Sequence, residues 1–187
     1  MKVHNMRIWG VKRPEKIPNK EVGKKVWQKA NSDQTKESVK IVSGEGFAEE
    51  GKGILEDKEF LLTTKKFAEE NKKLIIICWD KNGLQGLRDK FLKIYSDGER
   101  REIKEAIEYK TLTIYLAPKR PKWHFAVIDG KYLYIQKKHE EGTQSSKKSW
   151  LYCENDFFNE PRKYNDIFDS WAGKCTFITS GHVLKEG

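Results

Sequence analysis

One segment combines residue types that could act on a phosphate group: Arg120-Pro121-Lys122-Trp123-His124-Phe125-Ala126-Val127-Ile128-Asp129-Gly130-Lys131. Histidine and aspartate serve in acid-base and nucleophilic catalysis, and the surrounding basic residues suit an anionic ligand. Because His124 and Asp129 stand five residues apart on an apolar strand, a regular strand points their side chains to opposite faces. A histidine at a strand start and an aspartate in a turn are also ordinary structural choices.

The segment resembles the strand motif of the phospholipase D-like superfamily. In that family a strand carries His, any residue, Lys, four residues and then Asp, and it runs into a hairpin that often contains Asp-Gly-Lys. The resemblance is close over this strand and looser from about Ser38 to Cys175, including an aromatic helix with Phe168 and Trp171. It implies an α/β fold with a single mixed β-sheet flanked by helices, a phospholipase D-like half. Residues 1–37 lie outside it.

The motif is incomplete in this chain. With Asp129 at the family's Asp position, Lys122 occupies the position of the nucleophilic His, and His124 occupies that of the Lys. Anchoring the motif on His124 instead places Ala126 and Lys131 at the Lys and Asp positions. Neither register restores the signature.

This departure bears on catalysis. The resemblance implies a reaction in which one imidazole attacks phosphorus, a second protonates the leaving oxygen, and two lysines hold the equatorial oxygens. Such a site needs two motif copies, in one chain or across a dimer. A homodimer of this chain would supply two His124 and two Lys122 around one phosphate, which suits anion binding better than nucleophilic attack.

The basic residues gather in two zones that account for the net charge of +9. Residues 1–40 carry 11 basic and 4 acidic groups, and residues 110–148 carry 9 and 3. Both zones contain tryptophan, which can stack a base while lysine and arginine bind phosphate. An alternative explanation of the basic residues, without any binding role, is the lysine-rich surface of a protein from a hot environment. The candidate residues for binding phosphate or nucleic acid are Lys119, Arg120, Lys122, Trp123, His124 and Lys131.

Strand and helix patterns alternate along the chain and predict a mixed α/β sheet. The run Leu74 to Trp79 is apolar on both faces, as in a central strand covered by helices. Asp129-Gly130 is a strong hairpin signal. We therefore predict a basic N-terminal extension over residues 1–37 and a phospholipase D-like domain over 38–187. The expected strands lie near 38–42, 74–79, 111–116, 124–128, 132–136, 150–153 and 176–179, with helices near 22–30, 57–71, 84–95, 103–107 and 161–171.

Several classes of protein are excluded or disfavoured. The longest apolar run has six residues, far short of the roughly 20 of a membrane helix, and the N-terminus lacks an apolar leader. Cys78, Cys153 and Cys175 are odd in number and widely spaced, which argues against a disulfide framework and favours a reducing cytoplasm.

No metal or cofactor is expected. His124, Asp129 and His139 lack the tight spacing of metal ligands. Gly44-Glu45-Gly46 follows a predicted strand but has no third glycine three residues later, which argues against a dinucleotide site.

Three functions follow as hypotheses. The first is a non-catalytic or weakly catalytic module that binds a phosphate-bearing polyanion, most readily nucleic acid, with Asp129 orienting a basic partner or capping the turn. The second is a homodimeric, metal-independent nuclease or phosphodiesterase that uses His124 as nucleophile together with Lys122 and Asp129. The third is a module that holds a protein or an anionic membrane surface, which predicts a sizeable exposed apolar patch.

Overall fold

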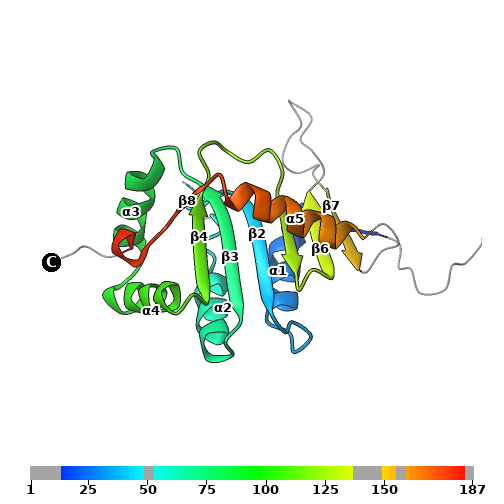
Figure 1. Ribbon diagram of the computed structural model, residues 1–187, viewed down its shortest axis with the longest axis horizontal. Coiled ribbons are helices and arrows are strands. Elements are labelled where there is room, and N and C mark those ends of the chain that lie inside the picture. Colours follow the sequence, from blue (N-terminus) through cyan, green and yellow to red (C-terminus); the bar gives the residue numbers. More distant parts are fainter. Residues whose placement is uncertain (1–13, 49–52, 137–148, 155–158, 184–187) are drawn as a thin grey trace, which may run out of the picture.

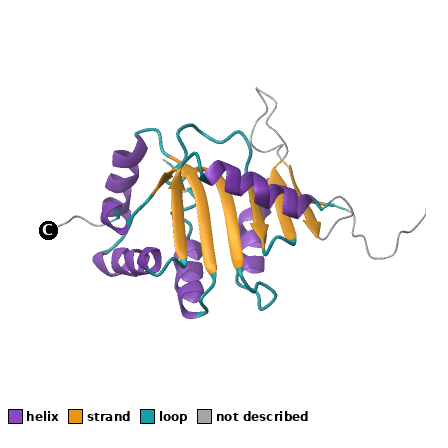
Figure 2. Ribbon diagram, viewed as in Figure 1, coloured by secondary structure: helices purple, strands orange, loops and turns teal. Residues whose placement is uncertain are grey.

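Eight strands form one mixed sheet in the part of the chain that the structure describes (Figures 1 and 2). The structure is a computed structural model and describes residues 14–48, 53–136, 149–154 and 159–183. The strands are β1 (Glu15–Pro18), β2 (Ser38–Glu45), β3 (Lys73–Trp79), β4 (Leu112–Leu116), β5 (Phe125–Ile128), β6 (Tyr132–Gln136), β7 (Ser149–Glu154) and β8 (Thr176–Phe177). Their order across the sheet is β1-β7-β6-β5-β2-β3-β4-β8. This confirms the predicted fold class.

Strand directions divide the sheet into two halves. Strands β2, β3 and β4 are parallel, whereas β5, β6, β7 and β1 continue the sheet in antiparallel pairs. The ends of β2, β3, β4 and β6 therefore lie at the same edge as the starts of β5 and β8. We call this the carboxyl edge, and the opposite one the amino edge. In open α/β sheets, ligands bind outside the carboxyl ends of the parallel strands.

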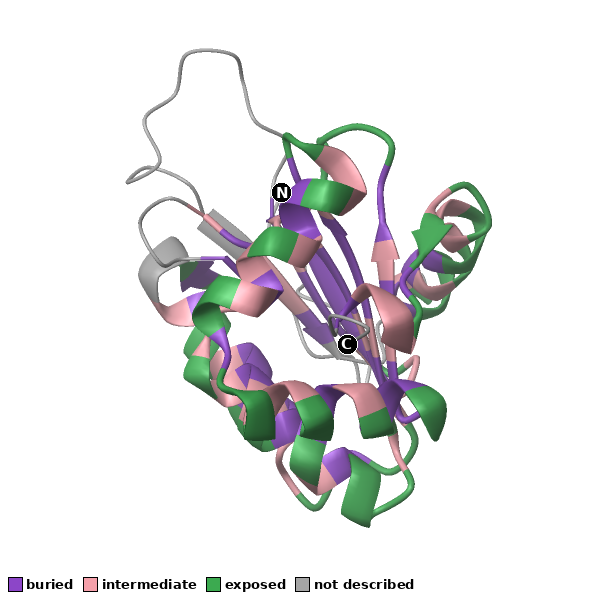
Figure 3. Cartoon of the chain, turned by 90° about the vertical axis from the view of Figure 1, so that its left-hand side faces the viewer, coloured by how far each residue is buried: buried purple, intermediate pink, exposed green. Residues whose placement is uncertain are grey.

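Helices cover both faces of the sheet (Figure 1). They are α1 (Asn19–Ala30), α2 (Lys58–Glu69), α3 (Gly83–Ile94), α4 (Asp97–Glu108) and α5 (Glu160–Ala172), with a 3-10 turn η2 at Ser180–His182. One core packs the first four helices against the sheet around Trp27, Phe60 and Phe91, and a second core packs α5 around Phe125 and Phe168. Strand β3 lies between the cores, and Figure 3 shows buried residues concentrated in the sheet.

The segment before β2 belongs to the same sheet and core. Strand β1 pairs with β7, and Ile17 and Trp27 are almost fully buried. The Trp27 indole also donates a hydrogen bond of 3.0 Å to Asp57, which caps α2 by accepting from the backbone N–H of Glu59. Residues 15–18 thus form an edge strand of the sheet, and residues 19–30 form a helix whose apolar side chains join the core.

The predicted turn between β5 and β6 is confirmed. Asp129 and Gly130 have positive φ angles of 52° and 64°, and with Lys131 they form the loop between Ile128 and Tyr132, which pair across the hairpin. The predicted closing strand is also present, because β8 pairs with β4. In the described part of the chain, every helix falls short of the length and apolar content needed to cross a bilayer.

Candidate anion-binding site at the carboxyl edge

Strand β5 separates the two residues that the sequence motif singled out. His124 directly precedes the strand, at the carboxyl edge, and Asp129 directly follows it, at the amino edge. At about 3.3 Å per residue, the five-residue offset places their backbones about 16 Å apart. The structure therefore does not bring Asp129 together with His124 and Lys122. Lys131, in the hairpin that follows Asp129, is likewise remote from the other predicted phosphate ligands.

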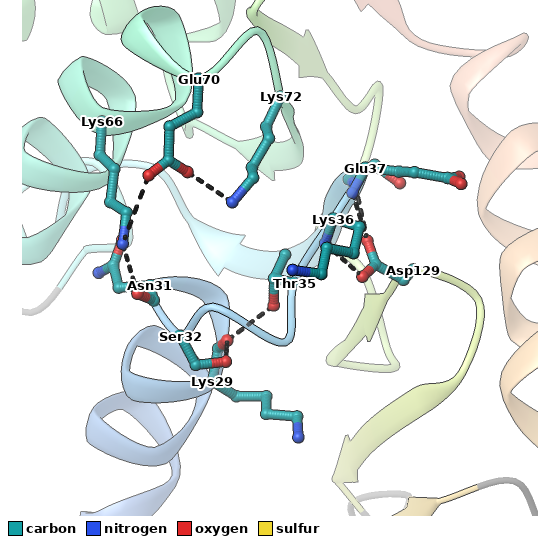
Figure 4. Close-up of polar contacts among 11 residues, drawn as sticks. Lys29, Asn31, Ser32, Thr35, Lys36, Glu37, Lys66, Glu70, Lys72 and Asp129 are labelled. Atoms are coloured by element: carbon teal, nitrogen blue, oxygen red, sulfur yellow. Dashed lines mark hydrogen bonds and ion pairs between the residues drawn. The ribbon is translucent and has the colours of Figure 1, made fainter.

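The Asp129 carboxylate has a structural partner (Figure 4). It accepts backbone N–H bonds from Lys36, Glu37 and Ser38 at 2.7, 3.0 and 2.9 Å, and the Asp129 N–H donates to the Ser38 carbonyl at 2.9 Å. These bonds tie the loop before β2 to the β5–β6 hairpin. From the sequence, Asp129 was expected to orient a basic partner or to cap its own turn; the contacts observed for its carboxylate are instead with backbone N–H groups of the loop before β2.

A pocket of about 450 Å³ lies at the carboxyl edge, beneath the loop that joins β4 to β5. Figure 1 shows this loop arching over the upper edge of the sheet, beside the end of α5. The pocket is lined by Ile77, Ala117, Pro118, Lys119, Arg120, Pro121, Lys122, Trp123, Trp171, Lys174 and Cys175. Four of the predicted phosphate ligands, Lys119, Arg120, Lys122 and Trp123, thus line one pocket.

The prolines explain why the chain forms a loop here. Ala117 makes a last ladder bond by donating its N–H to the Cys78 carbonyl at 2.8 Å. Pro118 and Pro121 have no N–H to donate, so the segment cannot extend β4 or begin β5 earlier. Pro121 is buried, whereas Lys119 and Lys122 are exposed. The loop is thereby fixed with its cations directed toward solvent at the pocket rim.

Three more lining residues come from the end of α5 and the segment after it, which were not predicted from the sequence as site residues. Trp171 lies in the last turn of α5, and Lys174 and Cys175 lie between that helix and β8. Because β8 runs antiparallel to β4, it begins at the carboxyl edge and carries these residues there. A strand near residues 176–179 was predicted from the sequence. Its pairing partner and its direction, which bring these residues to the pocket, were not predicted.

His124 lies beside the pocket and is not among its lining residues. A Cβ atom at Gly44 would lie only 3.1 Å from Cε1 and 3.3 Å from Nε2 of the His124 ring, so this close packing depends on glycine. The other histidine in the described ranges, His182, lies in η2, which packs against α4. Within the described chain, the carboxyl edge therefore carries one imidazole, and not the pair that phosphodiester transfer uses.

Positive charge dominates the pocket rim. Four cations line it, and Glu45 at the end of β2 opposes them through an ion pair of 3.6 Å with the Arg120 guanidinium. That pair is solvent-exposed, with 62% of the Arg120 side chain accessible, so it holds the guanidinium weakly. Arg120 remains available to a phosphate that offers a bidentate partner.

Aromatic rings form the wall behind these cations. The ring centroids of Trp123 and Tyr164 are 6.3 Å apart, and Phe125 contacts both Tyr164 and Trp171, at 5.1 and 6.2 Å. Burial raises the pKa of Tyr164 to about 12, and it also raises the pKa of Cys175, so both groups stay neutral at pH 7. Trp123 keeps 38% of its surface exposed. The site can thus bind an anion at its rim and a flat ring against its wall.

No constellation for a metal ion is evident among the described residues, in which no three His, Cys, Asp or Glu side chains converge. The carboxyl-edge pocket itself is lined by cations, which repel a metal ion.

Comparison with solved structures identifies the fold as phospholipase D-like. Nuc from Salmonella typhimurium, a phospholipase D family member, matches with a TM-score of 0.53 and 5% identity over 89% of this chain and 97% of its own. NucT from Helicobacter pylori matches with a TM-score of 0.53 and 12% identity over 89% and 99%. Identities this low establish the fold alone. No protein-family model and no curated protein sequence matches the chain.

A DNA-binding protein shares the same fold. TrmBL2, an archaeal chromatin protein whose structure shows a novel mode of DNA binding, matches with a TM-score of 0.58 and 12% identity over 95% of this chain. The chain spans 57% of the length of TrmBL2. The fold thus occurs both in phospholipase D family members and in a chromatin protein, so function has to be argued from the site.

Proposed function

We propose that this chain binds a phosphate-bearing polyanion, specifically nucleic acid, through the carboxyl-edge pocket. The observation that carries the proposal is the loop between β4 and β5, which places Lys119, Arg120 and Lys122 beside the half-exposed Trp123. Lys174, which follows α5, adds a fourth cation to the lining. Lysine and arginine bind phosphate oxygens through charge-assisted hydrogen bonds, and an indole offers a surface on which a base stacks.

Binding without cleavage is the form of the activity that the site supports. A single imidazole lies at the carboxyl edge of the described chain, and its ring packs against Gly44 beside the pocket. Asp129 is engaged at the other end of β5. Similarity of fold to a DNA-binding chromatin protein and to phospholipase D family members is compatible with this proposal.

The proposal is tested by titrating labelled single- and double-stranded DNA and RNA across a salt series, without added metal, while following the same samples for cleavage. We expect affinity to fall steeply as salt rises, because cations that neutralise phosphates release counterions, and we expect intact nucleic acid. Lys122→Ala weakens binding. Lys104→Ala is the matched control, because this lysine lies on α4 and pairs only at the surface, with Glu108 at 3.7 Å.

Other outcomes would replace the proposal. Cleavage that is lost in His124→Ala would favour a homodimeric phosphodiesterase. Binding to anionic lipid vesicles but to no nucleic acid would favour a membrane-surface module. Absent or salt-insensitive binding to all these polyanions would overturn a phosphate-binding role.

A further inference from the structure

The carboxyl-edge pocket has two chemically different parts. Its rim carries the cations of the β4–β5 loop, whereas Ile77, Trp123 and Trp171 give its wall a flat and apolar character. A volume of about 450 Å³ lies within the range of about 300–1,000 Å³ typical of small-ligand pockets, so it can enclose a ring as well as contact an anion. A site for phosphate alone would not require this aromatic space.

The end of α5 makes the interior a poor place for a phosphate. The helix ends at Ala172, between the lining residues Trp171 and Lys174. Carbonyl groups at a helix C-terminus carry partial negative charge, which repels anions. The Trp171 carbonyl already accepts from the Lys174 N–H at 2.8 Å and from the Cys175 thiol at 3.2 Å. A neutral ring is therefore favoured beside these carbonyl groups, with phosphates held by the exposed cations of the loop and of Lys174.

We infer that the pocket takes an unstacked base of single-stranded nucleic acid, with the flanking phosphates on the cations of the loop. This inference rests on the proposed function and specifies its substrate. In a duplex the bases are stacked and paired, and extruding one costs a few kcal/mol. A single strand presents its bases freely, and each base stacked on an aromatic side chain contributes about 1–3 kcal/mol.

The pocket is expected to tolerate different bases. Stacking on the indole of Trp123 does not distinguish one base from another, because every base has a flat π-face. Recognition then depends on stacking and on phosphate contacts, which are common to all sequences.

The test compares one fluorescent DNA strand with the duplex of the same sequence, using the full chain at fixed low salt. Trp123→Ala is expected to weaken single-strand binding by about fivefold or more and to leave duplex binding unchanged. Trp123→Phe keeps a ring and is expected to retain most of the affinity. Tyr109→Ala, which removes an aromatic ring that is 76% exposed on the far helix layer, is the control for a general loss of aromatic surface.

Cys175 provides a second readout within the pocket. Cys78 and Cys153 are buried and Cys175 is partly exposed, so iodoacetamide at alkaline pH modifies Cys175 first. We expect the single strand to slow this modification, and expect inorganic polyphosphate, which lacks bases, to slow it much less. Mass spectrometry of the modified chain identifies the cysteine that reacted.

The outcomes separate the inference from the proposed function. Equal losses for single strand and duplex in Trp123→Ala, or equal protection of Cys175 by DNA and polyphosphate, would overturn base insertion while leaving phosphate binding intact. Single-strand binding that is lost in Lys122→Ala but unaffected by Trp123→Ala would also overturn it. If the unmodified chain binds neither form, both the inference and the proposed function fail.

Discussion

The two ends of β5 carry similar residue types and use them differently. At the amino edge, Asp129 accepts three backbone N–H bonds and fixes the loop before β2. At the carboxyl edge, the loop before His124 places cations at the rim of a pocket, with Glu45 as a weakly held counter-ion. The residues of one strand motif thus have two roles. At the amino edge they stabilise the fold (the structural end), and at the carboxyl edge they lie beside the proposed binding site (the binding end). Each substitution below is expected to affect one end and spare the other.

The largest effect is expected at the structural end. Asp129→Ala removes the acceptor of three hydrogen bonds and places a non-glycine residue without a polar side chain at a φ of 52°. We expect a loss of about 3 kcal/mol in the free energy of unfolding, measured by urea denaturation. Asp129→Asn keeps one acceptor oxygen and tolerates this φ, so it should lose less. Weaker nucleic-acid binding by the folded Asp129→Asn protein would contradict the structural role.

A smaller effect, in the opposite direction, is expected at the binding end. Glu45→Gln removes the carboxylate that pairs with Arg120, one of the cations that line the pocket. We expect binding to tighten by about 0.5 kcal/mol, roughly twofold, with a thermal midpoint close to that of the parent chain. Titration with the labelled strand measures this change. Weaker binding would show that Glu45 positions Arg120 and does not compete with the ligand.

Substitution of His124 distinguishes a binding protein from a catalyst. The His124 ring packs against Gly44 outside the lining of the pocket. We therefore expect His124→Ala to change the binding free energy by less than about 0.5 kcal/mol, the lower end of what one hydrogen bond contributes. Neither the parent nor the variant should cleave the strand on a denaturing gel. Cleavage by the parent alone would assign His124 to a reaction.

The smallest effect concerns a charge at the amino edge (Figure 4). A hydrogen bond from Lys72 holds the pKa of Glu70 below its ordinary value of 4.5, and the charges of Lys66 and Lys36 add to this effect. A lowered folded-state pKa stabilises the fold above pH 4.5, and this contribution is lost as the pH falls through the lowered pKa. Glu70→Gln should be slightly less stable than the parent at neutral pH, and the difference should vanish in acid. A difference that grows in acid would contradict this sign.

Local sequence patterns predicted most of the elements. The apolar run from Leu74 to Trp79 marked the central strand, and Asp129-Gly130 marked the hairpin. Each pattern lies within a few consecutive residues, so it can be recognised in the sequence without knowledge of tertiary contacts. The order of elements and the strand motif together predicted the fold class that the structure shows.

Contacts between residues far apart in the sequence could not be predicted from these local patterns. The role of Asp129 depends on Lys36, Glu37 and Ser38, more than 90 residues earlier. Incorporation of β1 into the sheet depends on its pairing with β7. Likewise, Trp171 and Lys174 reach the pocket only because β8 is placed beside β4. Such contacts are set by packing of the whole sheet, which local periodicity does not specify.

The most direct test compares the salt dependence of binding after removing two exposed lysines from either end. Lys119→Ala with Lys122→Ala removes cations from the carboxyl edge, and Lys36→Ala with Lys131→Ala removes an equal number from the amino edge. Each lost phosphate contact lowers the magnitude of the negative slope of log K against log salt by about 0.7–0.9. We predict that the first pair lowers it by about twice that amount and that the second leaves it unchanged. Equal losses, or a larger loss from the amino-edge pair, would contradict a binding site at the carboxyl edge.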